Sequence, residues 1–456
     1  MIECILKINS MINKSEIKIT NAWICQVSEN QITPIFGDVI FAQGRITDIQ
    51  EKSHKKIWSK PPSKADNVLD AAGRVLTLPQ INFHDHFYSR LVKGLPLSGP
   101  MDNFFCILEN LWWKVDRALD LEMVQACAQM AALESIKNGV TYIFDHHVSP
   151  DATAGSLPLI RDTLEQFGLR GVLCFETSDR NGTELADLAL RENENFLRDF
   201  TSNNFKGMMG LHASFTISDQ TLKKAADIVQ KYNAGIHIHL CEDKVDRELS
   251  LQKYSKFPAQ RLVDFYLLNP KSILSHGVHM DEDDYSLISQ SGAAIAYNSD
   301  SNMNNAVGLP QIKHVPLSTP ILMGTDGMHA NVARSLKQQF LVLRHAGSDF
   351  EYTFNYMHKI FFDQLCFIEK YFPDFPSLKI GDRADMILWD YVPPTPFSVD
   401  NFWGHFIYGM VERNIHSVVH NGKVLLKNFQ LVGADSSAIY ENIYQQGRRL
   451  FEKIKN

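Results

Sequence analysis

Short apolar runs of strand length recur along the middle of the chain, and several of them end in histidine or acidic residues. The run 75–83 ends at the triplet 84–86, which is His-Asp-His, and a second run ends in the segment 237–242. Two further runs end at His276 and at Asp326. The carboxyl ends of the parallel strands of a (β/α)8 barrel all lie on one face, where such barrels keep their active sites. We therefore expect these polar groups to meet there.

Helical patterns alternate with these runs. Residues 119–137 have the apolar spacing of a helix that ends at Asn138-Gly139, and strand-like residues 140–145 follow. Residues 205–212 are typical of another strand. Alternating strands and helices over residues 77–379 predict an α/β fold with a TIM-like (β/α)8 barrel.

Both ends of the chain have strand-like patterns instead. Residues 38–50 suit two strands around a glycine, and residues 384–390 suit another strand. Residues 417–426 predict a hairpin with an Asn-Gly turn. We therefore expect residues 1–76 and 380–456 to form one small, composite β-sandwich domain.

Composition limits the class of protein and its partners. The hydrophobic fraction of 45% and the charged fraction of 21% are ordinary for a soluble enzyme. The net charge of −7, without a Lys/Arg-rich run, argues against nucleic acid or an anionic membrane as a partner. The seven cysteines form no CxxC pair, and the amino terminus is not a signal peptide, so we predict reduced thiols in the cytoplasm. The first ~15 residues are expected to lie outside the core, with Met11 as an alternative start.

The histidines at the strand ends suit a metal. His84 and His86 are two residues apart, so both imidazoles point to the same side of a strand. His237 and His239 form a second such pair, in which one member can be purely structural. Imidazoles together with one carboxylate are typical ligands of a divalent transition metal, above all zinc, with iron as an alternative.

Several other residues have both a functional and a structural interpretation. Glu242 suits a loop that folds back over the metal, or a solvated helix start. His276 suits a ligand contact or a satisfied core histidine, and Asp326 a barrel-mouth carboxylate or an Asp-Gly turn. For His146 and His147, lining the pocket and lying outside it both stay open.

The aromatic segment after the first barrel strand also leaves two interpretations. Residues 104–113 can cover the substrate ring, or they can form a helix that packs against the barrel. For Trp112 and Trp113 we favour helix packing.

The ordered motifs resemble the amidohydrolase superfamily, in its cytosine-deaminase and chlorohydrolase-like branch. The resemblance covers nearly the whole chain and rests on LPQINFHDH, HIHLCED, LSHGVHMDEDD, NSDSNMNNAVG and ILMGTDG. Gln80 departs from the glycine that is usual in the first motif. Within the branch, the chain is most similar to the SsnA-type aminohydrolases, through NFFCILENLWWKVDRALD, DHHVSP, GLHASFTIS and NMNNAVGLPQ.

The resemblance implies roles for individual residues. It makes Glu242 the proton shuttle, His276 a contact of the attacking hydroxide or the substrate, and His212 a substrate contact. It implies four metal ligands, namely His84, His86, His239 and Asp326, the last also taking part in catalysis. Because no lysine ends a strand, we expect one metal per chain; Lys206 stands at a strand start.

These patterns predict a metal-dependent aminohydrolase. The expected reaction is hydrolytic deamination of an aminated heterocycle, such as a purine or pyrimidine derivative, with release of ammonia. One alternative is hydrolysis of another bond, by dechlorination or ring amide opening. Another is a barrel that serves only as a scaffold or binding protein. The expected partner is a small-molecule substrate, and the resemblance implies a homodimer.

Overall fold

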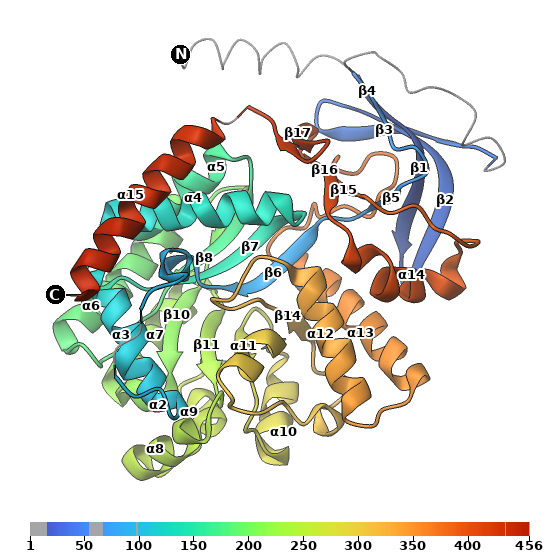
Figure 1. The fold of residues 1–456 in the computed structure, drawn as a ribbon. Helices are drawn as coiled ribbons and strands as arrows, with labels where there is room; N and C mark the ends of the chain where they lie inside the picture. The colour runs from blue at the N-terminus through green and yellow to red at the C-terminus, as the bar shows by residue number, and fades with distance from the viewer. Residues whose placement is uncertain (1–15, 54–66, 97–98, 434, 456) are drawn as a thin grey trace.

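A ring of parallel strands forms the centre of the molecule (Figure 1). The computed structural model describes residues 16–53, 67–96, 99–433 and 435–455. In chain order, the ring strands are β6 (Gln80–Asp85), β7 (Val140–His147), β8 (Arg170–Phe175), β9 (Phe205–Gly207), β10 (Met209–Ala213), β11 (Ile236–Leu240), β12 (Ile273–His276), β13 (Ala294–Tyr297) and β14 (Ile321–Met323). Isolated parallel bridges, Asp85 to Asp326 and Thr177 to Leu211, join the sheet β6–β9 to the sheet β10–β14.

Helices cover the outside of this ring. They are α4 (Leu121–Lys137), α5 (Ser156–Gln166), α6 (Thr183–Asn195), α7 (Asp219–Tyr232), α8 (Lys244–Tyr254), α9 (Pro258–Asp264), α10 (Glu282–Ser291), α11 (Ser299–Asn304), α12 (Val332–His345) and α13 (Phe350–Ile368). Helix α4 begins where the Asp120 side chain accepts the Met123 N–H, and it ends before Gly139, whose φ is 72°. The strand–helix alternation confirms the predicted barrel.

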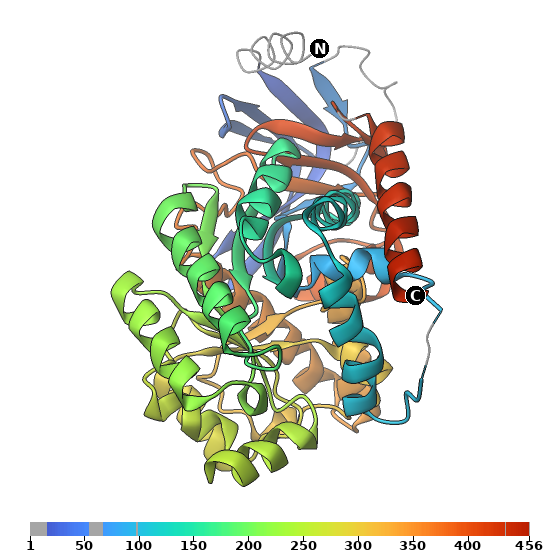
Figure 2. The same ribbon diagram turned by 90° about the vertical axis from the view of Figure 1, so that its left-hand side faces the viewer.

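A second sheet, built from both ends of the chain, lies at one end of the barrel (Figure 2). Its strands are β1 (Ile17–Ser28), β2 (Gln31–Ala42), β3 (Arg45–Glu51), β4 (Val68–Asp70), β5 (Val75–Thr77), β15 (Met386–Trp389), β16 (Ile415–His420), β17 (Lys423–Lys427) and β18 (Gln430–Leu431). The predicted hairpin is present, because Asn421 and Gly422 both adopt positive φ between β16 and β17. The domain boundaries at residues 76/77 and 379/380 stay a prediction.

The structure differs from the sequence-based prediction in two segments. The end of the chain is not all β, because it contains α14 (Phe402–Tyr408) and the long helix α15 (Ser436–Lys455). Helix α15 packs beside α4 (Figure 1). Apolar side chains at helical spacing on α15 pack against the core. The predicted strand 205–212 is two strands, because the chain leaves the β8 edge at Met208 and then pairs with β11.

Some predictions concern residues outside the described part of the chain. These are the placement of the first ~15 residues and the alternative start at Met11. Among the described helices, none is both long and apolar enough to cross a membrane.

A buried ion pair fixes the short helix η2 (Phe87–Val92) that follows β6. The Arg90 Nη2 lies 2.7 and 2.8 Å from the two carboxylate oxygens of Asp85, and both side chains are inaccessible to solvent. Arg90 Nε also lies 2.9 Å from Glu134 Oε2. Removing one partner of a buried pair leaves the other charge uncompensated.

We therefore expect Arg90→Leu to lower the free energy of unfolding by about 3–5 kcal/mol, as measured by urea denaturation. The control is Lys93→Leu, which removes a half-exposed cation that also contacts Glu134. That change should cost less than about 1 kcal/mol. Equal losses in the two variants would contradict the role of the buried pair.

Candidate metal and catalytic site

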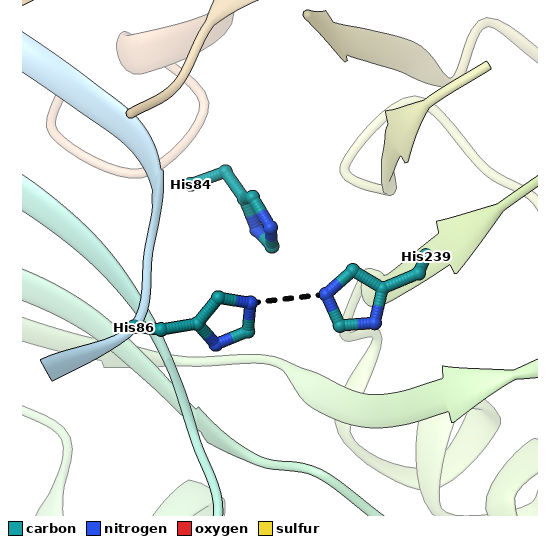
Figure 3. Close-up of side chains that lie close together, drawn as sticks. All are labelled: His84, His86 and His239. Atoms are coloured by element: carbon teal, nitrogen blue, oxygen red, sulfur yellow. Dashed lines mark hydrogen bonds between the residues drawn. The ribbon is translucent and has the colours of Figure 1, made fainter. Parts of the chain in front are cut away.

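The four predicted metal ligands lie together at the carboxyl ends of the strands. His84 lies on β6, His86 directly follows that strand, and β11 carries His239 (Figure 3). Asp326 follows β14. His86 Nε2 lies 3.0 Å from His239 Nε2 and 3.1 Å from Asp326 Oδ1. His84 Nε2 lies 3.7 Å from the same carboxylate oxygen. His84, His86 and His239 each offer a ring nitrogen within 4.8 Å of the other two, and Asp326 groups in the same way with His84 and His276.

The backbone around β14 holds Asp326 against β6. The N–H groups of Thr325 and Asp326 both donate to the His84 carbonyl, at 2.9 and 3.0 Å. A Cβ on Gly324 would lie 2.3 Å from Asn298 Oδ1, so only glycine allows this approach. Asp326 and His276 both have positive φ, 53° and 77°. Non-glycine residues in this region are strained, and such strain gathers at functional sites.

The protonation pattern of the histidines fits a bound cation. His86 Nδ1 contacts the His146 carbonyl at 2.6 Å, and His239 Nδ1 contacts the His212 carbonyl at 3.0 Å. A carbonyl only accepts, so both Nδ1 atoms carry the proton and, in neutral rings, both Nε2 atoms present lone pairs to each other. The Nε2 of His84 is buried and has no hydrogen-bond partner among the described residues. Converging lone pairs beside a carboxylate are a fitting donor set for a divalent metal.

His237, the other member of the second histidine pair, has a supporting position. Its Nε2 lies 2.9 Å from His84 Nδ1 and 3.3 Å from Ser275 Oγ. His237 therefore orients the ring of His84 and belongs to the layer behind the four ligands.

Glu242 and His276 lie next to the predicted metal ligands. Glu242 is only 9% exposed, which rules out the solvated interpretation. Its Oε2 lies 3.5 Å from His276 Nε2, and its Oε1 accepts from Asn305 Nδ2 at 3.2 Å. Burial raises the pKa of Glu242 to about 7, against the opposing effect of His276. His276 Nδ1 contacts Asn302 Oδ1 at 2.8 Å, which fixes the ring.

A cavity opens in front of these groups. Its empty volume is about 820 Å³, counting the space that is open to solvent. The segment after β6 forms one wall, through α2 (Phe104–Ile107), the π-helix η3 (Leu108–Trp112) and α3 (Trp113–Ala118). Trp112 and Trp113 pack against buried apolar residues, as favoured, and both also line the cavity. His212 lines the cavity too.

His146 and His147 are buried and do not line the cavity. His146 Nε2 lies 3.1 Å from two backbone carbonyls, those of Leu211 and His237, and its position is behind the ligands. His147 Nε2 contacts Ser149 Oγ at 2.9 Å. His146 therefore supports the site from within the barrel, whereas His147 is hydrogen-bonded to the loop that follows β7.

Sequence reasoning missed three charged residues of the cavity wall. Arg180 Nη1 donates to Glu176 Oε1 at 2.7 Å, and Arg180 Nη2 contacts Asp116 Oδ2. Glu176 directly follows β8, so the strand-end rule that selected the histidines applies to it as well. Asp116 lies on α3, and no spacing in the sequence places that helix at the cavity.

Comparison with known proteins identifies the family. Residues 77–360 match the family profile described as the Amidohydrolase family, and the chain belongs to that family. It is 24% identical over 466 residues to the 5-methylthioadenosine/S-adenosylhomocysteine deaminase of Desulforudis audaxviator, with 96% of this chain and 99% of the relative covered.

Two solved structures have the same fold. An adenosine deaminase from Xanthomonas campestris with bound zinc has a TM-score of 0.76 at 17% identity, covering 95% of this chain and 98% of that one. Atrazine chlorohydrolase TrzN from Arthrobacter aurescens complexed with zinc has a TM-score of 0.75 at 18% identity, covering 94% and 100%.

Proposed function

We propose that the protein is a metal-dependent aminohydrolase that removes an amino group from a purine- or pyrimidine-like ring and releases ammonia. The observation that carries this proposal is the buried carboxyl group of Glu242 beside the converging ligand set, inside an aromatic-lined cavity. The deaminase relative, aligned over nearly the whole chain, supports it.

One divalent metal per chain completes the proposed site. His84, His86, His239 and Asp326 would hold it. Zinc is the metal we propose, with iron as the alternative, because the two structural neighbours contain zinc and the donor set suits it. When bound, such a metal supplies a water molecule acidic enough to lose its proton near neutral pH.

The protein's own groups then move the protons. The Oδ1 of Asp326 faces His84 and His86, whereas its Oδ2 is turned to His276 and stays available to take a proton. Glu242 protonates the ring nitrogen next to the carbon under attack, which keeps the developing tetrahedral centre neutral. Because His276 Nδ1 faces an amide oxygen, its Nε2 donates to an oxyanion only from the imidazolium form.

The aromatic wall and His212 bind and orient the ring in this proposal. Phe104 and Trp112 come from the segment after β6 and offer flat apolar surfaces across the cavity from the strand ends. His212 comes from β10 and presents its imidazole to the cavity. Together they exclude bulk water from the reacting carbon.

A second candidate function is hydrolysis of another bond, such as a carbon–chlorine bond or a ring amide. The structural neighbour named as a chlorohydrolase motivates it. Glu242 favours deamination, because an acid at this position serves to protonate a ring nitrogen. A scaffold without catalysis is less well supported, since every proposed ligand position holds a metal-binding side chain.

A panel of aminated purines, pyrimidines and pterins tests the proposed function. We expect one equivalent of ammonia for each equivalent of ring product, with release stopped by a chelator and restored by zinc. Chlorinated analogues of the same rings serve as the comparison. Chloride release from them, with no ammonia from any aminated ring, would favour the second candidate function instead.

We also propose a homodimer, on the resemblance to the family, and a cytoplasmic location, on the seven cysteines that form no CxxC pair. Light scattering at micromolar concentration should give twice the chain mass of 51.9 kDa. A clean monomer would exclude the dimer.

A further inference from the structure

A buried carboxylate oxygen without a hydrogen-bond donor lies in the wall of the cavity. Asp116 is 1% exposed and lines the cavity. Its Oδ2 is paired with Arg180, but its Oδ1 is buried and has no partner among the residues that the structure describes. Leaving a buried acceptor unpaired is costly, and a ligand N–H or O–H at this oxygen would recover the loss.

Arg180 is held between two carboxyl groups of the wall, and its Nε is buried without a hydrogen-bond partner among the described residues. Its Nη1 and Nη2 contact Glu176 and Asp116, and its guanidinium lies 5.7 Å from the ring centre of Trp113. Among the described lining residues it is the sole lysine or arginine. Two carboxyl groups therefore share one cation, and this part of the wall has surplus negative charge when Asp116 is ionised.

His212 adds a second acceptor to the same wall. The Thr216 hydroxyl donates to the Ala213 carbonyl at 2.9 Å, so its oxygen accepts from His212 Nδ1 at 2.8 Å. A neutral imidazole protonated at Nδ1 presents a lone pair at Nε2. That Nε2 lies 3.9 Å from Glu176 Oε1 and needs a donor from the ligand.

We propose that the substrate ring carries a second amino- or amidine-like N–H group, which donates to Asp116 Oδ1, and carries no carboxylate or phosphate. This inference rests on the proposed function and names the substrate class of the same site. An N–H group is favoured because its positive end meets the surplus negative charge, whereas an anion would be repelled. Burial raises the pKa of Asp116 to about 7 although Arg180 opposes it, and a donor at Oδ1 would favour the ionised form.

Two purines that differ by one amino group provide the test. The kcat/KM for ammonia release from 2,6-diaminopurine should exceed that from adenine by about 10- to 100-fold, the range for a hydrogen bond to a charged group. In Asp116→Asn the ratio should fall towards unity, because the amide oxygen would pair with Arg180 and turn its NH2 group to the ligand donor. Asp162→Asn, at an exposed acid on α5, removes the same charge and should keep the ratio. An unchanged ratio in Asp116→Asn, or no preference in the parent, would overturn the proposal.

Two substrates with the same ring, one with and one without a phosphate group, test the exclusion of anions. Adenosine should be deaminated at least 10-fold better than adenosine 5′-monophosphate, and equal or better use of the nucleotide would overturn this part.

If no purine releases ammonia, purine deamination fails as the function. A binding measurement then still tests whether Asp116 accepts a hydrogen bond from a ligand. Benzamidine, a flat cation with several N–H donors, should then bind the metal-loaded protein in calorimetry. Asp116→Asn should weaken that binding at least 10-fold while Asp162→Asn leaves it unchanged. Absence of binding, or equal binding by Asp116→Asn, would contradict the inference.

Discussion

Replacing Glu242 by glutamine should lower turnover by about 10²–10⁴-fold, the usual contribution of general acid–base catalysis. The change keeps the size and shape of the side chain but removes the acid that lies 3.5 Å from His276. Because Glu242 is not one of the proposed ligands, metal content should stay at one equivalent. Steady-state ammonia release and plasma emission analysis on the same preparation measure both quantities.

A matched change on the neighbouring helix is the control for this experiment. Glu248 is exposed on α8, and Glu248→Gln should turn over substrate like the parent protein. Near-parental turnover in Glu242→Gln, on a substrate that releases ammonia, would exclude the proton-shuttle role while leaving the metal site untouched.

Replacing His239 by alanine should remove both metal and activity. His239 is one of the four proposed ligands, and its imidazole faces that of His86, with 3.0 Å between the two Nε2 atoms. We expect the metal content to fall from one equivalent to nearly none, and ammonia release to become undetectable. His345→Ala, an exposed histidine at the end of α12, should keep both.

Circular dichroism of His239→Ala separates metal loss from unfolding. A folded variant that still holds a full equivalent of metal and still releases ammonia would show that His239 is not a ligand.

The sequence predicted the ring and its ligand cluster because both follow from local patterns. Short apolar runs define parallel strands, and a polar residue at the end of such a run lies on the active-site face. His84 on β6 and His86 directly after it are placed on the same side by the two-residue period of a strand. This rule also brings His239, His276 and Asp326 to the same place without any tertiary information.

Features that depend on packing between distant segments were harder to predict. The pairing of Arg180 with Asp116 joins residues 64 positions apart, and nothing local indicates it. The position of helix α15 depends on the packing of its apolar side chains near α4, which the local sequence does not indicate. Trp112 and Trp113 have the spacing of ordinary packing residues, and only the course of the chain after β6 turns them to the cavity.

The central claim is that His84, His86, His239 and Asp326 hold one catalytic metal, and anomalous diffraction from crystals of the protein tests it most directly. Data collected at the zinc absorption edge should give one strong peak, about 2.0–2.2 Å from the Nε2 atoms of the three histidines and from one Asp326 oxygen. For iron, the same peak should appear at the iron edge. No peak at either edge, or a peak bound by a different set of side chains, would contradict the claim.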